Sequence, residues 1–141
     1  MKSIHWTVKL LFKRDVKTDA AAGVLTECFT QAESGNAEGV YMERLTLKDR
    51  KGYVLSTNDY WKTTGDGDFK SFNDLAQVTV EAKLIRRKDG KAEIELVNKG
   101  DATAISLKLN VRNPETMKRV LPAYVSDGYF NLLPGERRKV S

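Results

Sequence analysis

Apolar and polar residues alternate along most of the chain, as they do in strands that bury one face. The runs are residues 6–13, 24–30, 40–47, 53–58, 78–86, 92–98 and 104–112. In the run 6–13, Trp6, Val8, Leu10 and Phe12 share one face, and the polar side chains share the other. No stretch of about twelve residues keeps a helical period. The sequence therefore predicts an all-β protein.

Turn residues between these runs predict hairpins. The segment KDRKG (48–52) separates two runs, and its glycine can adopt the positive φ that a short hairpin loop needs. RKDGK (87–91) separates the next two, and NKGD (98–101) leads into the run 104–112, which Pro114 ends. Eight or nine short strands with regularly spaced turns predict a β-sandwich of immunoglobulin type.

Residues 59–77 show no strand alternation, yet they carry Tyr60, Trp61, Phe69 and Phe72. Exposing these rings would place apolar surface in water at a cost of about 25 cal/mol per Å². We therefore expect a structured crossing between two modules, with the rings packed at their interface. The alternative is a single sandwich in which this segment is a long surface connection.

The charge of the chain does not indicate a nucleic-acid partner. Its 24 Lys and Arg residues exceed its 19 Asp and Glu residues, which gives a formal net charge of +5. The basic residues lie mostly on predicted turns or outer strand faces, with acidic residues between them, rather than in one cluster. The short basic run LIRRKDGK (84–91) is predicted to be a hairpin tip.

The single cysteine, Cys28, excludes an internal disulfide and is predicted to be a small apolar core residue. No run reaches the roughly 18 apolar residues that span a bilayer. The first fifteen residues alternate in character, where a signal peptide would be continuously apolar. Neither a membrane nor an N-terminal export signal is expected within this sequence.

Catalytic chemistry is not predicted. His5 is the only histidine, so neither a Ser-His-Asp triad nor a multi-histidine metal site can form. The carboxylates of Asp66, Asp68, Asp127 and Glu136 fall in predicted turns, where acidic residues are common. The segment GDGD lacks the later ligands of a calcium loop. We predict no catalytic, metal or cofactor site.

Several separate segments resemble one family. They are GVYMERLTLKDRKGYVLSTNDYW (39–61), FNDLAQVTVEAKL (72–84), IELVNKGDATAISLKLNV (94–111) and VLPAYVSDGYFNLLPGERRKVS (120–141). Together they resemble the C-terminal part of glycoside hydrolase family 2 enzymes of the exo-β-glucosaminidase and β-mannosidase type. The strongest marker, SDGYF followed by L-PGE, comprises Ser126, Asp127, Gly128, Tyr129, Phe130, Leu133, Pro134, Gly135 and Glu136. Gly128 stands where the family often has Asn, and both residues tolerate the left-handed conformation.

The resemblance implies a domain arrangement. In that family a catalytic (β/α)8 barrel carries the acid and nucleophile carboxylates, and two immunoglobulin-like domains follow it. Residues 1–62 would then be the latter part of one sandwich, 63–74 a structured linker, and 75–141 the C-terminal sandwich. In that last domain Tyr129 and Phe130 would be aromatic plugs, and RRKVS a shortened final strand at a sheet edge.

The resemblance also implies a function. The chain would be a non-catalytic accessory region that buttresses the barrel and shapes the rim of its cleft. Its partners would be the barrel and the neighbouring β-sandwich domains of a parent that hydrolyses β-linked glucosamine or mannose glycosides. A periplasmic or secreted location follows from the resemblance alone.

Two other functions remain open. An autonomous carbohydrate-binding module would stack exposed rings on an oligosaccharide, and the candidate rings are Tyr60, Trp61, Tyr124 and Tyr129. Each of these lies beside other apolar residues, which favours core or interdomain packing over sugar binding for them. An adhesion or protein-interaction domain rests on the fold analogy.

Overall fold

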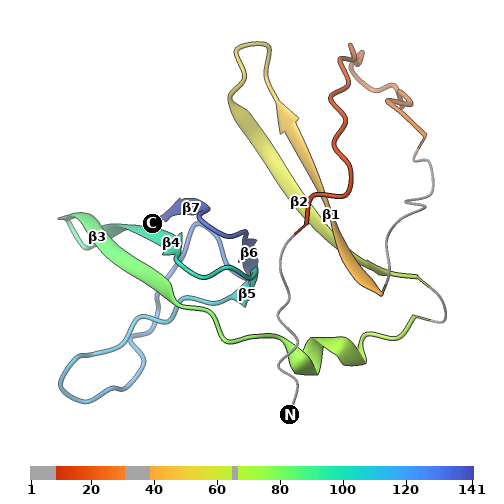
Figure 1. Cartoon of the computed structure of the whole chain (residues 1–141). Coiled ribbons are helices and arrows are strands. Elements are labelled where there is room, and N and C mark those ends of the chain that lie inside the picture. Colours follow the sequence, from red (N-terminus) through yellow and green to blue (C-terminus); the bar gives the residue numbers. More distant parts are fainter. Residues whose placement is uncertain (1–8, 31–38, 65–66) are drawn as a thin grey trace. The chain divides into compact units, whose positions relative to one another are not determined.

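The computed structural model describes residues 9–30, 39–64 and 67–141, and within them the protein is all-β (Figure 1). The strands are β1 (Val40–Lys48), β2 (Val54–Thr63), β3 (Val80–Lys88), β4 (Lys91–Asn98), β5 (Ala104–Leu107), β6 (Phe130–Leu132) and β7 (Arg137–Val140). A short 3-10 helix, η1 (Lys70–Asp74), is the only helical element of this part of the chain. The predicted fold class is confirmed. The described residues divide into two compact units, one within residues 9–73 and the other within residues 74–141.

The first unit is built on the antiparallel β1–β2 hairpin, which the alternation and the turn residues predicted. In its turn, the Asp49 carboxylate accepts hydrogen bonds from the amides of Lys51 (2.9 Å) and Tyr53 (2.8 Å). Gly52 has a φ of 88°. The predicted turn chemistry is therefore present.

Strand β2 runs through Thr63, so the expectation that residues 59–63 lack strand structure was wrong. Cross-strand contacts extend the ladder there. The Arg44 guanidinium donates two hydrogen bonds to the Asp59 carboxylate, at 2.6 and 2.9 Å, and the next pair along that face is Met42 and Trp61. Charge pairs and aromatic pairs stabilise a sheet without producing an apolar–polar alternation.

Two predicted strands are absent from the N-terminal part of the chain. Residues 9–13 of the run 6–13, and all of the run 24–30, have no strand structure, while residues 6–8 lie outside the described residues. No described strand pairs with either segment, and alternation alone cannot supply a ladder. Leu10 and Phe12 are exposed. Cys28 is also exposed, so its predicted core position was wrong.

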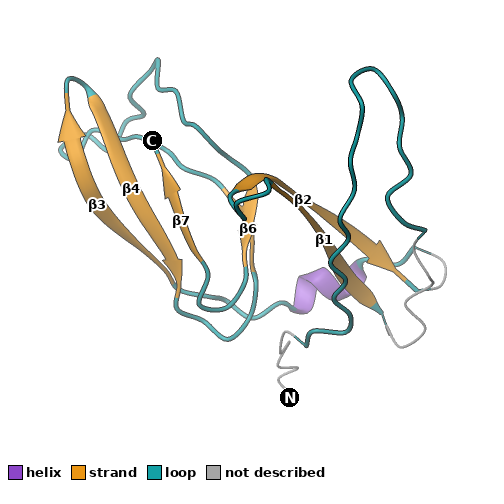
Figure 2. Ribbon diagram, turned by 90° about the horizontal axis from the view of Figure 1, so that it is seen from above, coloured by secondary structure: helices purple, strands orange, loops and turns teal. Residues whose placement is uncertain are grey.

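The second unit is a small sandwich. One sheet has the strand order β3–β4–β7, which Figure 2 shows side by side, and the other is the β5–β6 pair. Its buried core comprises Leu96, Ala104, Phe130, Leu132 and Val140, against which Val78, Val80, Ile94, Leu107 and Leu109 pack. Because these residues come from both sheets, the core joins the two layers.

Strand β5 ends at Leu107, although the alternation predicted a strand to Arg112. Ser106 has a φ of 51° and lies where the β5–β6 register shifts. The side-chain oxygen of Asn131 accepts a hydrogen bond from the Ser106 amide at 3.0 Å and so replaces the missing ladder bond. An extra residue changes which side chains face inward. Beyond it, Arg112 forms only an isolated bridge with Arg119.

Strand β3 forms an edge of its sheet. It carries the basic residues Lys83, Arg86, Arg87 and Lys88, and its register with β4 shifts between Leu84 and Arg86. Bulges and charged side chains both hinder pairing with another strand. The basic run that the sequence placed at a hairpin tip therefore also protects an edge.

A buried asparagine links four segments of the second unit. The side chain of Asn98 is fully buried, and its amide nitrogen donates to the carbonyl oxygens of Ala102 (2.8 Å) and Leu132 (2.9 Å). Its amide oxygen accepts from the Gly100 amide at 2.9 Å. The Asn98 carbonyl accepts from the Gly135 amide at 3.0 Å. These bonds join the ends of β4 and β6 to the turns that follow them.

Two neighbouring turns pack closely around this asparagine. A Cβ atom at Gly100 would lie 3.0 Å from Cγ1 of Val78, so only glycine fits without a shift of the neighbouring chain. In the predicted Pro134–Gly135 turn, the Glu136 carboxylate accepts from the Leu133 amide at 2.8 Å. The L-PGE segment thus closes its own turn and positions it against Asn98.

We expect the substitution Asn98→Ala to lower the free energy of unfolding by about 3 kcal/mol or more, because two carbonyls and one amide would lose buried partners. Chemical denaturation of the whole chain would measure it. Asn113→Ala is the control: its side chain accepts from the amides of Glu115 and Thr116, both at 2.9 Å, but it is exposed. Because water replaces those bonds, Asn113→Ala should lower the free energy of unfolding by about 1 kcal/mol or less. Equal losses in the two variants would contradict the role given to Asn98.

Candidate functional site

The two adjacent candidate rings of β2 lie on opposite faces of the hairpin. In the β1–β2 register Tyr60 pairs with Glu43, whereas Trp61 pairs with Met42. Paired residues share a face, and successive residues alternate between faces. Tyr60 and Trp61 therefore do not form one aromatic platform.

Tyr60 belongs to an apolar strip on one face of the hairpin. It shares that face with Leu45 and Leu47, and the three side chains are 47%, 45% and 60% exposed, respectively. On the same face the Glu43 carboxylate lies 2.8 Å from Nζ of Lys62, and this hydrogen bond raises the pKa of Lys62 above its ordinary value. The contribution of Lys62 is therefore present at neutral pH, below its ordinary pKa, and is lost as the pH rises through the raised pKa.

Trp61 packs within the first unit. Its ring meets Phe72 edge-on, with 5.0 Å between the centroids and an interplanar angle of 86°. Phe69 lies 5.7 Å from Phe72. Such edge-to-face contacts are favourable for aromatic pairs. Three of the four rings in the predicted crossing thus form one cluster around Phe72.

The other two candidate rings lie in the second unit and are exposed. Tyr124 is 91% exposed, and Tyr129 is 65% exposed. Of the two predicted plugs, Phe130 is buried in the core, as expected, whereas Tyr129 is not. The plug assignment of Tyr129 was therefore wrong.

Tyr129 has a left-handed backbone, with a φ of 59°. Gly128, the neighbouring residue that tolerates this conformation, has no positive φ in the structure. The Tyr129 amide donates to the Leu107 carbonyl at 2.8 Å, and Nζ of Lys108 lies 5.0 Å from the centroid of the Tyr129 ring. A bulky residue seldom adopts this conformation. The chain therefore holds a strained tyrosine with its ring in solvent.

The rest of the marker motif serves the fold. The Asp127 carboxylate accepts a hydrogen bond from the Arg138 guanidinium at 2.6 Å, and that guanidinium lies 4.6 Å from the centroid of Phe130. Asp127 and Glu136 are thus engaged in structural bonds. Asp68 accepts from the Lys70 amide at 2.8 Å, whereas Asp66 and His5 lie outside the described residues.

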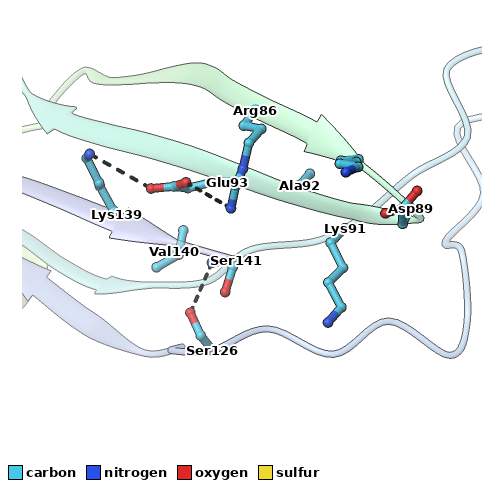
Figure 3. A pocket seen from close by; sticks show the side chains of 10 residues that line it. Arg86, Asp89, Lys91, Ala92, Glu93, Ser126, Lys139, Val140 and Ser141 are labelled. Carbon is cyan, nitrogen blue, oxygen red and sulfur yellow. Dashed lines mark hydrogen bonds and ion pairs between the residues drawn. The ribbon is translucent and has the colours of Figure 1, made fainter.

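A hollow of about 540 Å³ opens beside the tip of the β3–β4 hairpin (Figure 3). It is lined by Arg86, Lys88, Asp89, Lys91, Ala92, Glu93, Ser126, Lys139, Val140 and Ser141. Arg86 and Lys139 both approach the Glu93 carboxylate, at 3.9 and 3.8 Å. The lining side chains comprise four basic groups and two carboxylates, and the 141-residue chain adds the terminal carboxylate of Ser141, so the excess is one positive charge.

None of the sequence predictions includes this hollow. Its signal is the spacing of Lys88 and Lys91 around the Asp-Gly turn, since a two-residue turn places the flanking residues opposite each other. The residues from β7 and from the Ser126 segment carry no comparable signal, because only the folded sandwich brings them to the hairpin tip.

The described residues contain no group of three or more His, Cys, Asp or Glu side chains able to hold a metal ion. In the same part of the chain, no helix has both the length and the apolar character required to cross a membrane.

Comparison with known proteins gives one family. The family described as "Exo-beta-D-glucosaminidase Ig-fold domain" matches residues 58–141, which is more than half of the chain. A curated exo-beta-D-glucosaminidase of Arthroderma benhamiae is 28% identical over 112 residues. That alignment covers 67% of this chain but only 13% of the relative. No solved structure matches the chain.

The strain at Tyr129 gives a test that is independent of the ring. Tyr129→Ala and Tyr129→Gly both remove the ring and its contact with Lys108. We expect the glycine variant to be more stable than the alanine variant by about 1 kcal/mol, because glycine has no Cβ to oppose a positive φ. Thermal or chemical unfolding of both variants measures the difference.

Tyr124 provides the matched control, because it is exposed and its φ is not positive. There the order should reverse, with glycine less stable than alanine by about 0.5 kcal/mol or more. If alanine proves more stable than glycine at position 129 as well as at position 124, Tyr129 carries no backbone strain.

Proposed function

The chain belongs to the family of exo-β-D-glucosaminidase Ig-fold domains, and from this premise we propose that it is a non-catalytic accessory region of a glycoside hydrolase. The parent polypeptide would carry its catalytic carboxylates in a (β/α)8 barrel outside these residues. Its substrates would be β-linked glucosamine glycosides, in keeping with the name of the Arthroderma relative, or the related mannosides. The role of this region is to buttress the barrel.

We also propose a domain arrangement for the parent. Residues 1–62 form the latter part of one immunoglobulin-like sandwich, residues 63–74 connect it to the next, and residues 75–141 form the C-terminal sandwich. The division of the described chain between Asn73 and Asp74 supports the proposed start of the C-terminal sandwich at residue 75, and the family match, residues 58–141, includes that sandwich. The closed core around Leu132 supports it as well.

The observation that carries the buttressing role is the apolar strip of Tyr60, Leu45 and Leu47. These side chains lie together on one face of β1–β2 and remain about half exposed. An apolar strip of this kind favours burial against another surface. The chain covers 13% of its relative, so a parent of that size would supply ample surface for burial. We propose that the occupant is the adjoining part of the same parent polypeptide.

The parent polypeptide tests this proposal directly. We expect it to hydrolyse chitosan oligosaccharides or aryl β-D-mannoside, whereas the 141-residue chain alone shows no turnover above buffer. Introducing Leu45→Lys and Leu47→Lys in the parent should lower its temperature of inactivation by several degrees, while KM changes little. The physical reason is that two charges would have to be buried in the contact with the barrel.

Thr46→Lys is the control, since Thr46 lies between these leucines in the sequence but on the other face of the hairpin. It should leave the inactivation temperature nearly unchanged. A parent without glycosidase activity would overturn the enzymatic assignment. An active parent in which the double variant and the control behave alike would overturn the buttressing role alone.

The exposure of Tyr124 favours carbohydrate binding as a second candidate function. At 91% exposure its ring has no packing role within its unit. Exposed aromatic rings are suited to stacking on the faces of pyranose rings. The half-buried Trp61, engaged with Phe72, is less suited. Tyr124 and Tyr129 therefore remain as candidates for sugar contact. Tyr60 belongs instead to the apolar strip that is proposed to contact the parent polypeptide.

Isothermal titration of the chain with chitosan oligosaccharides tests this candidate. If Tyr124 binds sugar, saturable heat should be lost in Tyr124→Ala and kept in Tyr53→Ala, which removes another exposed tyrosine, 69% exposed in the β1–β2 turn. Absence of binding by the unmodified chain, or equal loss in both variants, would exclude a Tyr124 platform.

A further inference from the structure

The β3–β4 hairpin ends in a two-residue turn that places two lysines opposite each other. Asp89 and Gly90 have φ values of 50° and 73°, the left-handed pair typical of tight hairpin turns. Lys88 and Lys91 are then direct partners in the antiparallel register. Side chains of such partners share a face and lie about 5 Å apart at Cβ.

No carboxylate of the described residues forms an ion pair with Lys88 or Lys91, although the side chain of Asp89 belongs to the turn between them and lines the same hollow. Ten ion pairs connect described residues, and neither Lys88 nor Lys91 takes part in any of them. Like charges directly opposite each other in a sheet destabilise it. With Asp89 counted, the hairpin tip carries one excess positive charge, which an anion held between the two ammonium groups would neutralise.

The surrounding hollow provides room and further donors. Arg86 and Lys139 share the single carboxylate of Glu93, so their charges are only partly balanced. Lys91 extends away from Glu93 in Figure 3, and the Ser126 hydroxyl oxygen accepts the Ser141 amide at 3.0 Å. That bond leaves the hydroxyl hydrogen of Ser126 available to donate. The hollow, about 540 Å³ in volume and open to solvent, has room for such an anion.

We propose that this hollow binds a phosphate or sulfate group, free or as an ester on a sugar-sized molecule, between Lys88 and Lys91. Tetrahedral oxyanions accept hydrogen bonds from several donors at once, and charge-assisted bonds to ammonium groups are the strong ones. The neighbouring guanidinium of Arg86 reinforces the positive field. This site is independent of the proposed accessory function, since it requires neither a barrel nor a glycan substrate.

NMR titration of the ¹⁵N-labelled chain tests the proposal. Sulfate, inorganic phosphate and glucose 6-phosphate are added separately, with potassium chloride at matched ionic strength and glucose as the neutral control. We expect saturable shifts of the Asp89, Gly90 and Lys91 amides with the oxyanions and none with chloride or glucose. Equal saturation by phosphate and by glucose 6-phosphate would identify the free group as sufficient. Tighter binding of the ester would show that the sugar also contacts the hollow.

The double variant Lys88→Gln, Lys91→Gln should bind at least about tenfold more weakly, because each lost charge-assisted bond is worth roughly 1.5 kcal/mol or more. Without anions it should unfold at the same temperature as the unmodified chain or a higher one, since the repulsion is removed. Lys83→Gln with Lys118→Gln removes two lysines that do not line the hollow and should leave binding intact. Undiminished binding in the first variant, equal weakening in both, or a chloride response equal to that of sulfate would overturn the proposal.

Discussion

The second unit depends on the buried amide of Asn98. The two residues that β4 contributes to the core, Ile94 and Leu96, cannot hold β6 and β7 in place by apolar contact alone, because hydrophobic burial has no direction. The Asn98 side chain supplies direction by bonding to the Ala102 and Leu132 carbonyls, so the end of β4 has one position relative to the end of β6. The Gly135 turn, which begins the approach to β7, bonds to the same residue. A polar group that is fully satisfied inside an apolar core specifies a single arrangement more sharply than further apolar contact would.

The parts of the fold that the sequence predicted are local. Both long hairpins follow from alternation and from Gly52 and the Asp89–Gly90 turn, since neighbouring residues decide them. The strand predictions that were wrong depend on distant partners. Residues 24–30 alternate like a strand, yet no described strand pairs with them. Asn98 looks like a turn residue in the sequence. Its buried role requires the Leu132 carbonyl, 34 positions later, and no local pattern reveals that.

The candidate rings show the same division. The sequence shows which aromatic residues are present. The face on which each ring lies depends on strand register and backbone conformation, which the sequence pattern does not reveal. Adjacent residues of β2 point Tyr60 and Trp61 to opposite faces, and the left-handed backbone of Tyr129 turns its ring to solvent while Phe130 enters the core. Lys88 and Lys91 were noted only as surface charge, because the hollow beside them is completed by residues such as Ser126 from later in the chain.

The order in which the core residues occur along the chain has a consequence for synthesis on the ribosome. The β3–β4 hairpin can form as soon as Asn98 emerges, but Leu132 and Val140, which cover its apolar face, are made last. During that interval Ile94 and Leu96 have no partners from β6 or β7, and contacts between segments so far apart form slowly. The bulged, basic edge of β3 then lies on the only sheet of the second unit that has formed among the described residues. By repelling other nascent copies, it protects the hairpin until the sandwich closes.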